Sequence, residues 1–195
     1  MPRATRAQSE ATAARVLDAA WALFAAQGYP GVGLEEVAQR AGVTRGAVYH
    51  HYGSKTGLFH AVHARAQAQV AAAVEAAAAG SDDPWEALEA GSRAFLDASL
   101  GDRVRQVMLV DAPVVLGLDA WRAEDARGSA RLLGEALTAL AAAGVLRVGS
   151  VPACAALLSG AMNEAALWAA ATADPRAAVD DAWDVLRQML AALRT

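Results

Sequence analysis

The 195-residue chain has little of what marks secreted or membrane proteins: it contains one cysteine and six prolines. The single Cys154 excludes an intrachain disulfide and favours a reducing compartment. The longest apolar runs, such as residues 19–26, are far shorter than the roughly 20 residues of a membrane-spanning helix. The N-terminal residues include arginines but no apolar core of signal-peptide length. We therefore expect a cytoplasmic protein with no membrane segment.

Motifs of catalysis and metal binding are also missing. The sequence has no glycine-rich phosphate loop, nucleophile elbow or HExxH pattern. All four histidines lie between residues 50 and 63, far along the chain from Cys154. His50 and His51 are adjacent, and adjacent side chains of a helix point about 100° apart, so the two rings do not readily share one ion. We expect no enzymatic activity, no metal site and no cofactor.

Helix-forming residues dominate what is present. Hydrophobic residues make up 55% of the chain, and about half of them are alanine, which favours an all-α fold. Breaks at glycine and proline divide the chain into about nine predicted helices. Long helices are expected at residues 55–79, 84–100, 152–172 and 175–193, and a further helical segment at 113–143 has candidate breaks near Gly117 and Gly128. Asp83 is the predicted N-cap of the second of these, ahead of a first-turn proline.

Residues 34–59, LEEVAQRAGVTRGAVYHHYGSKTGLF, predict a helix-turn-helix. Ala38, Gly42 and Val48 lie at relative positions 0, +4 and +10. This motif needs a small residue where the helices touch, a residue that tolerates a left-handed backbone in the turn, and a branched apolar plug. Thr44 can cap the second helix through its hydroxyl oxygen. The chain is therefore predicted to bind DNA.

The second helix of this motif exposes side chains suited to a DNA groove. Arg45 can donate hydrogen bonds to a guanine edge or to phosphate, while Ala47 is short enough to offer only methyl contact. The predicted DNA-binding residues are Gly33, Thr44, Arg45, Gly46, Ala47, Tyr49, His50, His51 and Lys55.

The charge distribution is consistent with DNA binding by the N-terminal third. Residues 1–65 carry seven basic and four acidic side chains, a net charge of +3. The remaining 130 residues carry ten basic and seventeen acidic side chains, a net charge of −7. A basic head on an acidic body suits a protein that binds DNA through the head alone.

The same N-terminal residues resemble the TetR family of bacterial transcription regulators. The resemblance runs through RVLDAAWALFAAQGY (residues 15–29), EVAQRAGVTRGAVYHHYGSK (36–55) and GLFHAV (57–62). It implies a three-helix DNA-binding domain over residues 1–53, with a basic arm at about 1–8, and a larger helical regulatory and dimerisation domain over 54–195. One position departs from the family, which usually has a Thr-Ser type pair where this chain has Val32 and Gly33. A helix N-terminus still offers backbone N–H groups to phosphate, so we expect a lost contact rather than lost binding.

Two long C-terminal helices are predicted to form a dimer interface, which is also what the resemblance implies. Their apolar residues repeat at helical spacing, although such stripes can also close the core of a single subunit. A twofold protein matches the two half-sites of a palindromic operator. The predicted interface residues are Leu158, Met162, Ala165, Trp183, Leu186, Met189, Leu190 and Leu193.

Polar and aromatic residues within apolar runs are candidates for a ligand pocket. Asp111 and Asn163 each interrupt such a run, and pockets are mostly apolar with a few placed polar groups. Asp111 can instead begin the helix at Pro113, and Asn163 can hydrogen-bond across a dimer. The predicted ligand-binding residues are Phe95, Met108, Asp111, Trp121, Asn163 and Trp168.

These features predict a homodimeric repressor that a small, largely hydrophobic molecule releases from double-stranded operator DNA. The repressor sign comes from the family resemblance. Two alternatives stay open: a DNA-binding regulator controlled by a protein partner, and an enzyme or structural protein that uses the helix-turn-helix as a fold element. A palindromic DNA bound in a salt-sensitive manner excludes the second.

Overall fold

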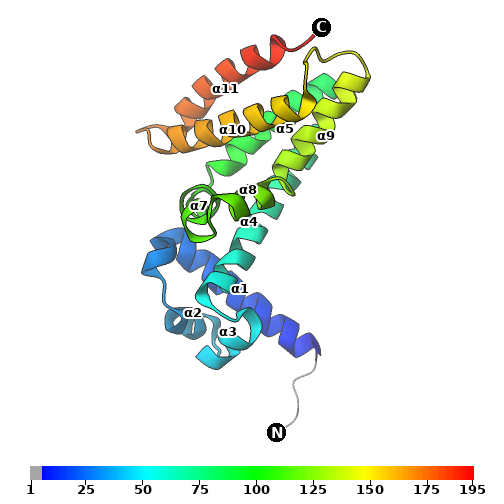
Figure 1. Ribbon diagram of the computed structural model, residues 1–195. Coiled ribbons are helices and arrows are strands. Elements are labelled where there is room, and N and C mark those ends of the chain that lie inside the picture. The colour runs from blue at the N-terminus through cyan, green and yellow to red at the C-terminus, as the bar shows by residue number, and fades with distance from the viewer. Residues whose placement is uncertain (1–5) are drawn as a thin grey trace. The chain divides into compact units, whose positions relative to one another are not determined.

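The computed structural model describes residues 6–195, in which every regular element is helical (Figure 1). The elements are α1 (Arg6–Gly31), α2 (Leu34–Ala41), α3 (Arg45–Tyr52), α4 (Lys55–Ala78), α5 (Pro84–Ser99), α6 (Asp102–Arg105), the π-helical segment η1 (Gln106–Asp111), α7 (Ala112–Val115), α8 (Leu118–Asp125), α9 (Ser129–Ala142), α10 (Val151–Ala170) and α11 (Pro175–Ala191). The all-α prediction is confirmed. The described helices outnumber the nine expected, because both candidate breaks, at Gly117 (φ 84°) and at the turn of Gly128, divide residues 112–142 into three helices.

The described residues pack into two compact units. The first contains residues 6–66 and 102–118, and the second contains 67–101 and 119–195. The helix α4 therefore supplies residues to both units, and residues 102–118 pack with the N-terminal helices although they lie between α5 and α8 in sequence. The domain boundary predicted between residues 53 and 54 falls inside the first unit.

The core of the first unit lies between α1, α2, α3 and the start of α4. Phe24 and Phe59 are fully buried and meet edge to face, with ring centroids 5.2 Å apart. Tyr52 donates a hydrogen bond from its hydroxyl to the carbonyl of Ala13 (2.8 Å), which ties the end of α3 to α1. Together these contacts hold the helix-turn-helix against α1.

The helix α1 kinks near its end because Gly28 has a left-handed φ of 69°. The kink frees the backbone N–H of Tyr29, which donates to Oδ2 of Asp111 at 2.8 Å. The other oxygen of Asp111 accepts from Gln106 Nε2 at 3.1 Å. Asp111 thereby fastens residues 102–118 to the end of α1, and its carboxylate satisfies a donor that the kink would otherwise leave unpaired.

The second unit packs α5, α9, α10 and α11 against one another. Leu96, Leu137 and Leu190 are among its fully buried side chains. Two helices begin at aspartate caps: Asp83 accepts from the backbone N–H groups of residues 85 and 86, and Asp174 accepts from those of residues 176 and 177. The cap predicted at Asp83 is confirmed. No helix within residues 6–195 is both long and apolar enough to cross a membrane.

Candidate functional site

The geometry of α2, the turn and α3 matches the helix-turn-helix prediction. Gly42 adopts the left-handed conformation (φ 65°, ψ 40°), and the N–H of Val43 closes the turn on the carbonyl of Ala38 at 3.0 Å. Ala38 is buried where the helices touch, and Val48 is the buried plug from α3. Thr44 Oγ1 accepts from the N–H of Ala47 at 3.2 Å and caps α3, as predicted.

One face of α3 is open to solvent. Among residues 44–51 only Val48 is buried; Thr44, Arg45, Gly46, Tyr49 and His50 are exposed, and Ala47 and His51 are partly exposed. A short helix that buries one plug residue and presents charged, aromatic and small side chains has the form of a recognition helix.

Arg45 is held in place by two neighbours. Its guanidinium donates to the hydroxyl of Tyr49 at 3.1 Å, lies 5.3 Å from the centroid of the Tyr49 ring, and forms an ion pair with Glu35 of α2. The hydrogen bond with Tyr49 and the carboxylate of Glu35 raise the pKa of Arg45. The guanidinium is thus charged and engaged by Tyr49 and Glu35 in the free protein. The sequence-based prediction missed Glu35, which lies ten residues away on the other helix.

Lys55 lies at the first position of α4, with Nζ 4.3 Å from the centroid of the Tyr29 ring. The hydroxyls of Tyr29 and Thr56 are hydrogen-bonded at 2.9 Å, which fixes the ring. The Oγ of Ser54 accepts from the N–H of Gly57 at 2.9 Å and caps this helix. The aromatic face therefore positions the ammonium beside a helix N-terminus, where a phosphate is favoured.

The turn before α2 lacks the hydroxyls that the family usually has there. Val32 is buried, and Gly33 is the N-cap of α2 with no side-chain hydrogen bond to the helix. The backbone of Gly33 is extended (φ −100°), and a Cβ added there would meet only Glu35 Oε2, at 3.9 Å. The space for a capping hydroxyl is therefore present but unused.

The rings of His50 and His51 meet edge to face with centroids 5.2 Å apart. Among residues 6–195 no group of three or more His, Cys, Asp or Glu side chains is placed to hold a metal ion. The pair forms part of the exposed face of α3.

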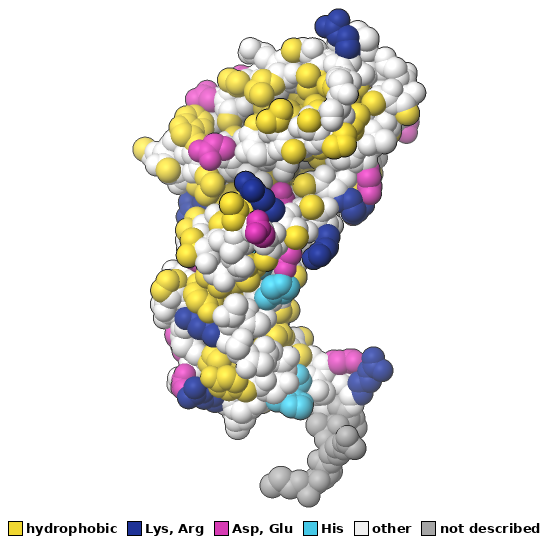
Figure 2. Space-filling model, viewed as in Figure 1, with side chains coloured by type: hydrophobic (Ala, Val, Ile, Leu, Met, Phe, Trp, Pro, Cys, Tyr) yellow, Lys and Arg dark blue, Asp and Glu magenta, His cyan; other side chains and the backbone are white. Residues whose placement is uncertain are grey.

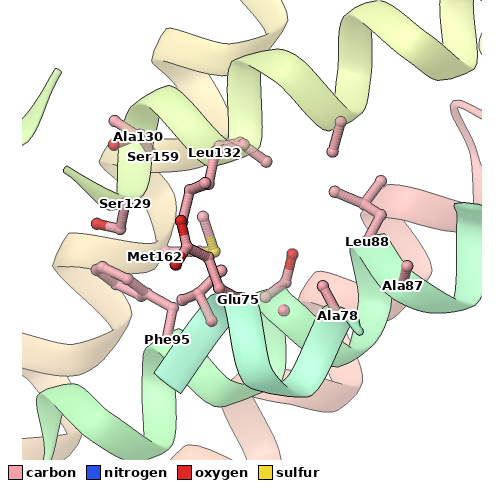
Figure 3. Close-up of a pocket in the computed structure, with 15 residues that line it drawn as sticks. Glu75, Ala78, Ala87, Leu88, Phe95, Ser129, Ala130, Leu132, Ser159 and Met162 are labelled. Atoms are coloured by element: carbon pink, nitrogen blue, oxygen red, sulfur yellow. The ribbon is translucent and has the colours of Figure 1, made fainter. Parts of the chain in front are cut away.

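The second unit contains a cavity of about 240 Å³ between α4, α5, α9 and α10 (Figure 3). Its walls are mostly apolar, with Phe95 and Met162 at one end and Ala87 and Leu88 at the other (Figure 3). The full lining is Val74, Glu75, Ala78, Ala87, Leu88, Gly91, Ser92, Phe95, Ser129, Ala130, Leu132, Leu133, Ala136, Ser159 and Met162.

Buried polar groups gather at the Phe95 end of this cavity. Oδ2 of Asp125 accepts from Ser159 Oγ at 3.2 Å and from Asn163 Nδ2 at 3.5 Å. Ser129 Oγ, Asn163 Oδ1 and the amide of Gln67 are buried without a hydrogen-bond partner in the described structure. Each buried polar group left unpaired costs about 1–3 kcal/mol. So many in one place is unusual for a region that serves packing alone.

Of the six residues predicted to bind a ligand, Phe95 alone lines this cavity. Asn163 is buried behind it with Asp125, and Trp121 of α8 is partly exposed. Met108 and Asp111 are buried in the first unit, where Asp111 holds the end of α1. Trp168 is half exposed on α10. Sequence reasoning missed Gln67, Ser129 and Ser159, which the fold brings together from three helices.

The predicted dimer residues divide into three sets. Leu158, Met162, Leu186 and Leu190 are buried within the chain. Met189 and Ala165 line an exposed groove between α10 and α11, whose other lining residues are Ala161, Glu164, Trp168, Asp181, Ala182, Val185 and Leu186. Trp183 and Leu193 are partly exposed and lie outside the groove lining. Apolar side chains are visible on the surface over these two helices (Figure 2).

Two family models match the chain. Residues 16–62 match the model described as "Bacterial regulatory proteins, tetR family", and residues 85–193 match "Tetracyclin repressor-like, C-terminal domain". The regulator TtgW from Pseudomonas putida, described as uncharacterized, is 46% identical over 67 residues, 34% of this chain, and the match spans half of TtgW's length.

Solved structures are similar over nearly the whole chain. A TetR-family transcriptional regulator from Pectobacterium atrosepticum has a TM-score of 0.82 and 30% identity and covers 98% of each chain. A protein whose structure is described as the molecular basis for control of antibiotic production by bacterial hormones has a TM-score of 0.71 and 32% identity, over 94% of this chain and 98% of that one.

Proposed function

This chain belongs to the TetR family of bacterial DNA-binding transcription regulators, and from that premise we propose that it is a homodimeric repressor released from a palindromic operator by a small, largely hydrophobic molecule. In this proposal the exposed face of α3, with Arg45 and Tyr49, enters the major groove, and Lys55 at the start of α4 contacts phosphate. The second unit receives the effector.

The observation that carries the proposal is the apolar cavity of about 240 Å³. A mostly apolar cavity with a few polar groups in its wall is the form that small-molecule sites take. The helix α4 carries both Lys55 and the cavity residues Val74 and Ala78. An effector changes DNA affinity only if it binds one state of the protein better than the other, and a helix shared by both sites is a route for that coupling.

The proposed dimer forms through the groove on α10 and α11. Trp168, Val185 and Met189 are each 47–58% exposed, which is unusual for side chains of this size unless a partner covers them. Val185→Asp should therefore give monomers by light scattering. Val114→Asp is the matched control, since Val114 is 84% exposed in the first unit. Unaltered dimers of Val185→Asp would exclude this face. Leu186 and Leu190 are unsuitable probes because their burial also supports the subunit itself.

The ligand response is tested by filling the cavity. A DNA duplex selected from a random library would be used to screen small molecules for release of the protein, measured by fluorescence anisotropy. Ala78→Phe should bind this DNA but need at least about tenfold more effector for release, because Ala78 lines the cavity. Ala76→Phe, on the exposed side of the same helix, should respond like the wild type. Identical responses of the two variants would contradict the proposal.

Control by a protein partner is the alternative. Its prediction is that no small molecule releases the DNA and that occupation of the cavity has no effect on DNA affinity. The buried polar groups beside the cavity favour the small-molecule proposal, because a surface-docking partner would leave them unpaired.

A further inference from the structure

The unpartnered polar groups of the second unit lie around one end of the cavity. Ser129 is 6% exposed, lines the cavity and has a hydroxyl with no hydrogen-bond partner. Gln67 is also 6% exposed and unpartnered, and it precedes the lining residue Val74 by seven residues, so both lie on one face of α4. A Cβ at Gly128 would lie 2.9 Å from Gln67 Oε1, which places this amide against the backbone next to Ser129.

Asn163 completes this group from α10. It follows the lining residue Ser159 by one helical turn, and both donate to the carboxylate of Asp125. The Oδ1 of Asn163 stays without a partner. Hydroxyl and amide groups therefore converge from three helices on the end of the cavity that Ser129, Ser159 and Phe95 mark in Figure 3.

The charges around the cavity argue against an anionic ligand. No lysine or arginine is among the lining residues, whereas Glu75 lines the wall and Asp125 lies behind Ser159. Arg131 approaches Glu75 at 3.7 Å, but both side chains are about half exposed and so lie at the solvent side. The unpartnered groups are the hydroxyl of Ser129, the amide of Gln67 and the amide oxygen of Asn163, which suit a neutral group that both donates and accepts hydrogen bonds.

The cavity opens to solvent on the Glu75 side, and its volume sets the size of the part of the molecule that it buries. A dry cavity of about 150 Å³ accepts benzene, which has six non-hydrogen atoms. In proportion, 240 Å³ accepts a molecule of about ten.

We propose that the effector is an uncharged amphipathic molecule of about ten non-hydrogen atoms, whose apolar body fills the cavity and whose hydroxyl-type head pairs with Ser129, with Gln67 and Asn163 behind it. This inference rests on the proposed ligand response and adds the chemical class of the ligand. The apolar walls of the cavity suit the apolar body of such a molecule. Its polar head would give hydrogen-bond partners to the buried groups that are unpaired in the free protein.

Four probes with about ten non-hydrogen atoms each test the inference on the full-length protein: 1-nonanol, octanoate, nonylammonium and butylbenzene. Isothermal titration calorimetry at neutral pH should show 1-nonanol binding at least about tenfold more tightly than the anion or the cation, because a buried polar site rejects groups that it cannot pair. Ser129→Ala should weaken 1-nonanol by about 2- to 10-fold, the value of one hydrogen bond, and leave butylbenzene unchanged. Ser99→Ala is the control, because its hydroxyl is also buried and unpartnered but lies outside the cavity lining.

The outcomes separate this inference from the proposed function. Binding of butylbenzene without a preference for 1-nonanol, tighter binding of octanoate or nonylammonium, or equal effects of Ser129→Ala and Ser99→Ala would overturn the proposed head group while leaving a ligand cavity. Failure of all four probes to bind would overturn the inference and remove the support that the cavity gives to a ligand response. Neither result bears on the proposed binding of DNA, which is measured in a separate assay.

Discussion

The ion pair between Glu35 and Arg45 leads to a prediction about DNA affinity that could not be drawn from the sequence alone. Arg45 cannot donate fully to a base or phosphate while it is paired with Glu35 and hydrogen-bonded to Tyr49. Both members of the ion pair are more than half exposed, so breaking it costs little, about 1.5- to 5-fold in an equilibrium constant. Glu35→Gln should therefore tighten operator binding by about that factor, through the released guanidinium of Arg45.

A double-mutant cycle assigns the effect to Arg45. Arg45→Ala alone should weaken operator binding by roughly 5- to 150-fold and relax the preference at one base if it contacts guanine. In the Arg45→Ala background, Glu35→Gln should lose most of its gain, because no guanidinium is left to release. Fluorescence anisotropy with a labelled operator at fixed salt measures all four proteins. An equal gain in both backgrounds would show that Glu35 acts on the DNA directly and would refute the pairing argument.

Three further predictions follow from the caps and buried contacts. Gly33→Ser should stabilise the protein by about 0.2–0.5 kcal/mol by capping α2, and the added hydroxyl should tighten DNA binding. A loss of stability in urea unfolding would contradict the open geometry at this position. Asp111→Ala should cost about 1–3 kcal/mol in urea unfolding because it leaves the N–H of Tyr29 unpaired, and an unchanged midpoint would mean that the kink is held otherwise. Hydrogen bonds from the backbone N–H groups of Glu86 and Trp85 lower the pKa of Asp83, so its contribution to stability is present above the unfolded pKa and is lost as the pH falls through the folded value. Asp83→Asn should therefore make the free energy of unfolding depend less on pH in the acid range. An unchanged pH dependence would contradict this.

The helix-turn-helix was predictable because its signals are local. Gly42, Thr44 and Val48 act on neighbours within a few residues, and the structure places each as its spacing indicated. The left-handed turn and the hydroxyl cap depend on backbone geometry that the residue types nearly fix. The pairing of Arg45 with Glu35 depends on how two helices cross, which a single periodic pattern does not specify.

The cavity was predicted to exist in the body, but most of its residues were not. Large side chains and isolated polar residues were expected to frame it, whereas the lining consists largely of alanine, leucine and serine from four helices. Asp111 interrupts an apolar run not because it lines the cavity but because its carboxylate accepts a hydrogen bond from the backbone N–H of Tyr29 at the kinked end of α1. A void is a property of long-range packing, so no local pattern marks its walls.

The dimer stripes show a related limit. Helical periodicity groups Leu186, Met189 and Leu190 on one side of α11 but does not separate the part that faces the chain's own core from the part that faces solvent. In the structure Leu186 and Leu190 are buried, while Val185 and Met189 are exposed. Consecutive side chains of an α-helix are rotated by about 100° around its axis, so neighbouring residues can differ in whether they face the core or the solvent.

The most direct test of the central claim is the sequence of the DNA that the purified protein selects from a random duplex library. A homodimer reading DNA through two copies of α3 should enrich an inverted repeat whose half-sites are about 34–36 Å, one helical turn, or a multiple apart. Enrichment of a sequence without twofold symmetry, or no enrichment above the starting library, would contradict the account.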